Sequence, residues 1–105
     1  MLKIPRNLVP KLSQFQKKHP ELIGKYFLEK IKLSVLKNEN RTQLYRIGNT
    51  KNVAGVEYQE YVPMLEVMKN QFIEAELYEL AKESQELIRT IHINQLITET
   101  QNMKL

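Results

Sequence analysis

The sequence predicts an α+β fold with two short N-terminal helices, a central β-hairpin and one long C-terminal helix. Residues 62–97 contain no glycine and a single proline at their second position, which is compatible with one uninterrupted helix. Two runs rich in β-branched and aromatic residues, 44–47 and 53–62, flank five polar or glycine residues, which is typical of a hairpin. Before them, Pro10 and Pro20 each begin an amphipathic segment, and these segments predict the two shorter helices.

The N-terminal segment is basic and divided by prolines. Regular helix is expected from about Pro10, because Leu12 and Phe15 then share one face and the lysines lie off it. Pro20 and Glu21 suit the first turn of the next helix, since proline is tolerated there and an acid complements the helix dipole. The second helix therefore has a well-defined start.

Residues 31–36 allow two interpretations. The helical interpretation has one stripe made of Phe27, Leu28, Ile31 and Val35. In the other interpretation the helix stops near Glu29, and alternate apolar residues from Ile31 form a strand, which would be the third of the sheet. The pattern favours the helix, and both remain open from sequence alone.

A polar loop and a bulge are expected around the hairpin. Residues 38–42 carry no side chain that needs burial, so a loop should precede the first strand. Gly55 lies inside the second run and predicts a β-bulge there, because glycine within a strand often marks one.

The long helix is expected to extend beyond its own domain and to join two copies of the chain. About 30 helical residues span roughly 45 Å, whereas a compact chain of this size is only about 33 Å across. Apolar residues that such a helix exposes to water form a protein-binding surface, and a symmetric second copy of the chain is what most often buries it. The sequence therefore predicts a homodimer. Its predicted interface consists of Ile73, Leu77, Leu80, Leu87, Ile88 and Ile91.

Two groups of apolar residues lie off the helix face, here called the apolar stripe, that carries these six interface residues. The first group is Leu65, Met68 and Phe72, and the second is Ile93, Leu96 and Ile97. The first group predicts either a bend near Asn70 or a different packing partner for the first turns. The second group lies on the far side of the helix and predicts a break or a change of partner near His92.

Charge is divided unevenly along the chain. Residues 1–52 carry twelve Lys or Arg and three Glu, a formal charge of +9, whereas residues 53–105 carry four Lys or Arg and nine Glu, a charge of −5. A basic half of this kind suits contacts with nucleic-acid phosphates, which supply affinity without sequence selectivity. The predicted nucleic-acid-binding residues are Lys11, Lys17, Lys18, Lys25, Arg41, Arg46 and Lys51.

Four glutamates should form an acidic row along the long helix. They are Glu76, Glu79, Glu83 and Glu86. Carboxylate metal sites in helical bundles also need a histidine three residues after a glutamate, and none follows here, so no metal is expected. The row is then either a solvated face or a surface that docks on the basic half of the same chain or of a dimer mate.

The expected function is that of a small non-enzymatic regulatory protein, homodimeric through its long helix and binding DNA or RNA through its basic half. The alternative is a protein-interaction module or adaptor that uses the apolar stripe without nucleic acid. A small basic ribonuclease using Arg46 and Tyr45 is the enzyme alternative, and no cofactor is expected.

One domain, residues 1–97, and a flexible tail at 98–105 are expected from the length and the polar C-terminus. Apolar runs do not exceed three residues and the first ten residues lack the apolar centre of a signal peptide, so the sequence predicts a cytoplasmic protein with no membrane contact. The absence of cysteine agrees with that compartment.

Overall fold

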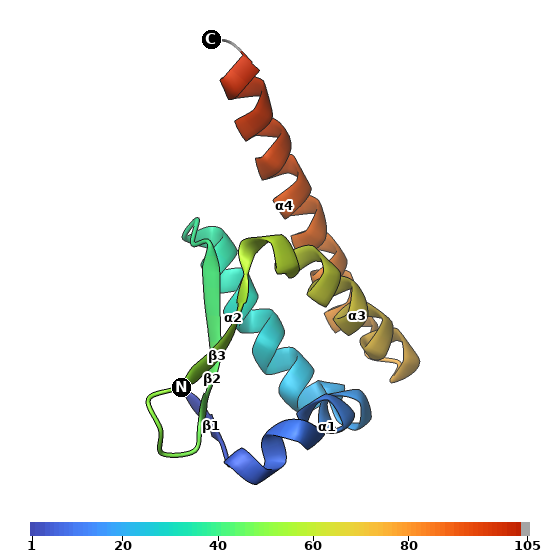
Figure 1. Ribbon diagram of the computed structural model, residues 1–105. Helices are drawn as coiled ribbons and strands as arrows, with labels where there is room; N and C mark the ends of the chain where they lie inside the picture. The colour runs from blue at the N-terminus through green and yellow to red at the C-terminus, as the bar shows by residue number, and fades with distance from the viewer. Residues whose placement is uncertain (104–105) are drawn as a thin grey trace.

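The computed structural model describes residues 1–103 and confirms the α+β fold (Figure 1). A three-stranded sheet and a helical layer share one core. In chain order the elements are β1 (Leu2–Ile4), the 3-10 helix η1 (Arg6–Lys11), α1 (Leu12–Lys18), the π-helical turn η2 (Pro20–Gly24), α2 (Lys25–Leu36), β2 (Arg41–Ile47), β3 (Val53–Glu57), the 3-10 helix η3 (Tyr58–Glu60), α3 (Tyr61–Glu74) and α4 (Tyr78–Met103).

The sheet contains the predicted hairpin and a third strand at an unexpected place. Strands β2 and β3 are antiparallel, and β1 pairs in parallel with β2 on its other edge. The third strand therefore comes from residues 2–4, and residues 31–36 belong to α2. The helical interpretation is confirmed, because Ile31 and Val35 are buried on the same helical face, in the core.

A bulge in β2 turns the consecutive side chains of Leu44 and Tyr45 toward the core. Gln43 lies opposite Gly55 and Tyr45 lies opposite Ala54, so Leu44 is the extra residue. The predicted bulge thus falls on the strand facing Gly55. A side chain at Gly55 would overlap the carbonyl oxygen of Thr42, which explains why glycine occupies this position.

The expectation that residues 38–42 carry no side chain that needs burial is wrong for Thr42. Thr42 is buried, and its hydroxyl donates a hydrogen bond to the Tyr61 hydroxyl at 2.9 Å. Tyr61 in turn donates to the carbonyl oxygen of Glu39 at 3.2 Å. This chain of hydrogen bonds ties the loop before β2 to the first turn of α3.

The prediction of one helix over residues 62–97 is wrong, because the chain reverses direction between α3 and α4. The Leu77 N–H donates to the Phe72 carbonyl at 2.8 Å, and the Glu76 N–H donates to the Ile73 carbonyl at 3.0 Å. This pair of bonds is a Schellman motif, which ends a helix with one residue in the left-handed region. Here that residue is Glu76, with φ of 60°.

The two helices formed by this reversal lie side by side (Figure 1). The reversal also explains why the apolar residues of 62–97 do not share one stripe, since two separate helices face each other across the core. Buried residues of α3 are Tyr61, Leu65, Met68 and Phe72, and those of α4 are Ala81, Ser84, Leu87, Ile88 and Ile91. The fully buried Ser84 donates its hydroxyl to the Leu80 carbonyl at 2.9 Å.

Helix α4 continues well beyond the rest of the molecule (Figure 1). Every residue from 92 to 103 is exposed, whereas Ile91 is buried. We call residues 92–103 the protruding half of α4, and residues 1–91 the body. The predicted break near His92 does not occur, because α4 runs without interruption to Met103 and includes residues 98–103 of the predicted tail. Residues 104 and 105 of the predicted tail lie outside the described part.

Candidate functional site

The predicted dimer-interface residues lie in different environments. Leu87, Ile88 and Ile91 are only 7%, 2% and 1% exposed, because they belong to the core of the single chain. Leu77 and Leu80 are partly buried against the same core, and Ile73 is exposed. The structure therefore does not bring these six residues together into one free surface.

A different apolar surface lies on the protruding half of α4. Ile93, Leu96 and Ile97 are 50%, 62% and 50% exposed. Their spacing places them on one face, together with Thr100, and that face is opposite the side of α4 that packs on the body. We call Ile93, Leu96, Ile97 and Thr100 the outer stripe. Its apolar members are visible in the sequence, but they indicate a free surface only once the helix is known to continue past His92.

No charged residue interrupts this surface. Within α4, residues 90–98 contain no Lys, Arg or Glu, whereas the segment from Glu79 to Arg89 carries five charged side chains. The outward face of α4 thus changes from charged beside the body to neutral and apolar on the protruding half. A long apolar helix face that no other described residue covers is a common feature of protein-binding surfaces.

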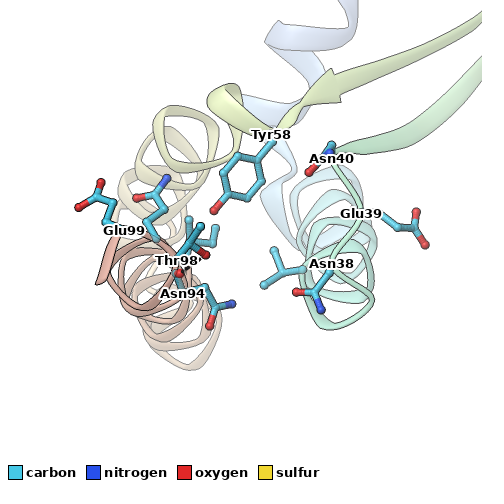
Figure 2. A pocket seen from close by; sticks show the side chains of 10 residues that line it. Asn38, Glu39, Asn40, Tyr58, Asn94, Thr98 and Glu99 are labelled. Carbon is cyan, nitrogen blue, oxygen red and sulfur yellow. Dashed lines mark hydrogen bonds between the residues drawn. The ribbon is translucent and has the colours of Figure 1, made fainter. Parts of the chain in front are cut away.

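A polar cleft of about 530 Å³ lies on the other side of the protruding half (Figure 2). Its walls are α4 and the turn that follows α2, and its lining is Val35, Asn38, Glu39, Asn40, Tyr58, Ile91, Asn94, Gln95, Thr98 and Glu99. The Tyr58 ring points into the space between the two walls, while the carboxylates of Glu39 and Glu99 point away from it. The cleft therefore offers neutral hydrogen-bonding groups around one aromatic ring.

The seven predicted nucleic-acid-binding residues are all exposed, but they occupy three separate places. Lys11, Lys17, Lys18 and Lys25 lie on η1, α1 and the start of α2, Arg46 and Lys51 lie at the loop end of the hairpin, and Arg41 lies at the other end of β2. Lys3 adds to the second place, because it pairs with Arg46 across β1 and β2. Arg41 forms an ion pair with Glu57.

Two further lysines line a groove of about 320 Å³ between α2 and the start of β2. Lys30 and Lys37 are seven residues apart on α2 and face the groove together with Arg41 and Glu39. These two lysines are not among the seven predicted nucleic-acid-binding residues. Their spacing in the sequence could have indicated a shared site, because residues two helical turns apart lie on the same face of a helix.

The tyrosines near Arg46 do not form a surface on which bases could stack. Tyr61 is fully buried, and Tyr45 stacks on Phe27 in the core with ring centroids 6.3 Å apart. Arg46 is exposed on the opposite face of the sheet. Arg46 and Tyr45, which the ribonuclease alternative names, therefore lie on opposite faces of the sheet.

The acidic row is shorter than the sequence suggested, because Glu76 lies in the turn between the helices. Glu79, Glu83 and Glu86 are exposed on α4. The ion pairs found over residues 1–103 join His19 to Glu21, Arg41 to Glu57 and Lys69 to Glu66, and none of them involves the row. In one chain the row faces solvent.

Residues 1–103 contain no group of three or more His or Glu side chains placed to hold a metal ion. The same part of the chain has no helix with the length and hydropathy needed to span a bilayer. Comparisons with family models, with curated proteins and with solved structures found no match.

Proposed function

We propose that this chain is a non-enzymatic binding protein that works as a homodimer, joined through the outer stripe of α4. The observation that carries the proposal is the exposure of Ile93, Leu96 and Ile97 on a helix that extends beyond the body. Aliphatic side chains grouped on one helix face gain most from a second helix, because the two sets of side chains interlock.

A second copy fits this surface because the surface is neutral. Residues 90–98 contain no Lys, Arg or Glu, so two such segments approach without repulsion between like charges. Burying the exposed half of a Leu or Ile side chain contributes about 1 kcal/mol. Part of this gain offsets the entropy that the two chains lose on association. The dimer is therefore expected to be weak.

Sedimentation over a concentration series up to about 500 µM tests the proposal, because a weak dimer forms only at high protein concentration. The parent chain should shift from monomer to dimer. The double substitution L96E/I97E should remain monomeric, because it places two carboxylates in the stripe. The matched control Q95E/N102E adds the same charge to exposed positions on the other side of the same helical segment and should still dimerise. A parent chain that stays monomeric throughout would refute the proposal.

Nucleic-acid binding is a second candidate function, and the distribution of cations favours it. The basic residues of the N-terminal half are exposed except for the partly buried Lys30, and three of them, Lys30, Lys37 and Arg41, converge on the groove between α2 and β2. Binding through such residues should depend steeply on salt. On duplex DNA, the logarithm of the association constant should fall by about 0.9 per phosphate neutralised for each tenfold rise in salt concentration.

Fluorescence anisotropy with a labelled duplex at several salt concentrations tests this second function. The variant K17E/K18E should weaken binding for every sequence alike. The control K82E/R89E makes the same change of charge on the exposed outward face of α4 and should reduce binding less. Equal effects of the two variants, or binding that is insensitive to salt, would count against a specific basic surface.

A further inference from the structure

We infer that the two copies pair their protruding halves in antiparallel orientation, so that the two bodies lie at opposite ends of the dimer. This inference rests on the proposed homodimer and adds the geometry of the contact. It follows from the order of side chains along the outward face of α4. From the body outward, that face presents Lys82, Glu86, Arg89, Ile93, Leu96 and Thr100, at alternating spacings of four and three residues.

This spacing is that of a helix-pairing seam, and all six side chains are exposed. The seam has two chemically distinct parts. The first three residues are charged and lie beside the body, whereas the last three are neutral and lie on the protruding half. The orientation of a second helix therefore decides which part meets which.

A parallel pair would place like charges against each other. In a symmetric parallel dimer each seam residue meets its own copy, so Lys82, Glu86 and Arg89 would each face an identical charge. Like charges at facing positions of such a seam oppose pairing. The neutral part covers only about three helical turns, which leaves the charged part within reach of its copy.

An antiparallel pair avoids these contacts. If the pair is centred between Leu96 and Ile97, Leu96 meets the partner's Ile97 and Ile93 meets the partner's Thr100. Arg89 is then separated from the partner's Arg89 by fifteen helical positions, or about 22 Å along the axis. Charges at that distance are screened at physiological ionic strength, where the Debye length is about 8 Å.

The position of the body permits this arrangement. The body packs on the side of α4 that carries Leu87, Ile88 and Ile91, and the seam is on the opposite side. A helix docked on the outer stripe therefore meets no part of the body. The cleft around Tyr58 stays open, because its α4 wall is formed by Asn94, Gln95 and Thr98 on the inner side.

Cysteine crosslinking distinguishes the two orientations, and the chain contains no cysteine of its own. The variants I93C and T100C are oxidised separately and as a mixture in which one variant carries a size tag. A disulfide needs Cα atoms within about 7 Å. In the antiparallel pair the two copies of position 93 are about 10 Å apart along the axis, in addition to the separation of about 8–10 Å between the helices. Each variant alone should therefore remain uncrosslinked, and the mixture should give the tagged heterodimer.

A cysteine on the inner side, Q95C, serves as the control and should not crosslink alone or with either variant. Efficient crosslinking of I93C alone and of T100C alone would establish a parallel pair and overturn the inference, while leaving the homodimer intact. A sedimenting dimer in which no combination crosslinks would place the contact elsewhere and would also overturn it. Monomeric sedimentation of the reduced variants and of the parent chain would refute the homodimer itself.

Discussion

Replacing Glu76 tests the contribution of the turn between α3 and α4 to stability. Glu76 has φ of 60° and ends α3 within the Schellman motif. The left-handed conformation costs a residue with a side chain about 1–2 kcal/mol. Glycine adopts it without that cost but loses about 0.5–1 kcal/mol more conformational freedom on folding than alanine. Glu76→Gly is therefore expected to stabilise the chain by about 0.5–1 kcal/mol.

The matched variant Glu76→Ala separates this backbone effect from the removal of a negative charge, because alanine keeps the Cβ atom and the strained φ. Urea unfolding of the two variants should place the glycine variant at the higher midpoint with an unchanged slope. A gain of that size also raises the melting temperature of a domain of this length by about 2–8 °C. A continuous helix over residues 62–97 would give the opposite sign, because glycine inside a helix is about 1 kcal/mol worse than alanine. An alanine variant that is the more stable of the two would refute the reversal.

Two further substitutions test the packing of the hairpin against α3. Gly55→Ala should destabilise the chain by about 2 kcal/mol or more, since the new Cβ atom would overlap the Thr42 carbonyl and force the two strands apart; an unchanged urea midpoint would contradict this close approach. Tyr61→Phe should cost about 1–3 kcal/mol, because it leaves the buried Thr42 hydroxyl without its acceptor and the Glu39 carbonyl without its donor; a difference below about 0.5 kcal/mol in the unfolding free energy would show that these bonds are dispensable.

The sequence was sufficient to predict the fold class and the hairpin, because both depend on local signals. The β-branched runs on either side of Gly48 specified two strands, and Pro20 specified the start of a helical segment. The third strand was missed, since residues 2–4 are too few to show a period and their partner lies far away in the chain. Such pairing depends on tertiary contacts rather than on local propensity.

The reversal after Glu74 was missed for a different reason. Helices that end in a left-handed residue usually have glycine or asparagine there, and Ala75-Glu76-Leu77 contains neither. All three residues are acceptable in a helix, so local propensity favoured continuation. The packing of Leu77 and Phe72 at the turn, together with the buried faces of both helices, outweighs that preference.

The error in the fold carried over to the candidate surfaces. With one long helix, Leu87, Ile88 and Ile91 had no partner within the chain and were assigned to a second copy. With two helices, those residues are covered by α3 and α2, and the free surface moves to Ile93, Leu96 and Ile97. The reasoning from an overhanging apolar helix still supports a dimer, but it applies to a different set of residues.

The parallel pairing of β1 with β2 has a consequence for the order in which the sheet forms and opens. Leu2 and its partner Tyr45 are 43 positions apart, whereas the hairpin loop between β2 and β3 has five residues, 48–52. Closing the longer loop costs about 2 kcal/mol more entropy. This entropy cost is offset only by the pairing of the three residues of β1 and by the hydrogen bond that the Leu2 N–H donates to the Tyr26 hydroxyl at 3.2 Å.

Strand β1 should therefore dock after the hairpin and α2 have formed, and it should detach before the rest of the molecule unfolds. Each detachment exposes the backbone groups along one edge of β2, which β1 otherwise covers. The Gly48 N–H donates to the Ile4 carbonyl at 2.8 Å, so the rate of amide exchange at Gly48, rather than the global free energy of unfolding, measures how often this chain presents an unpaired strand edge to its neighbours in solution.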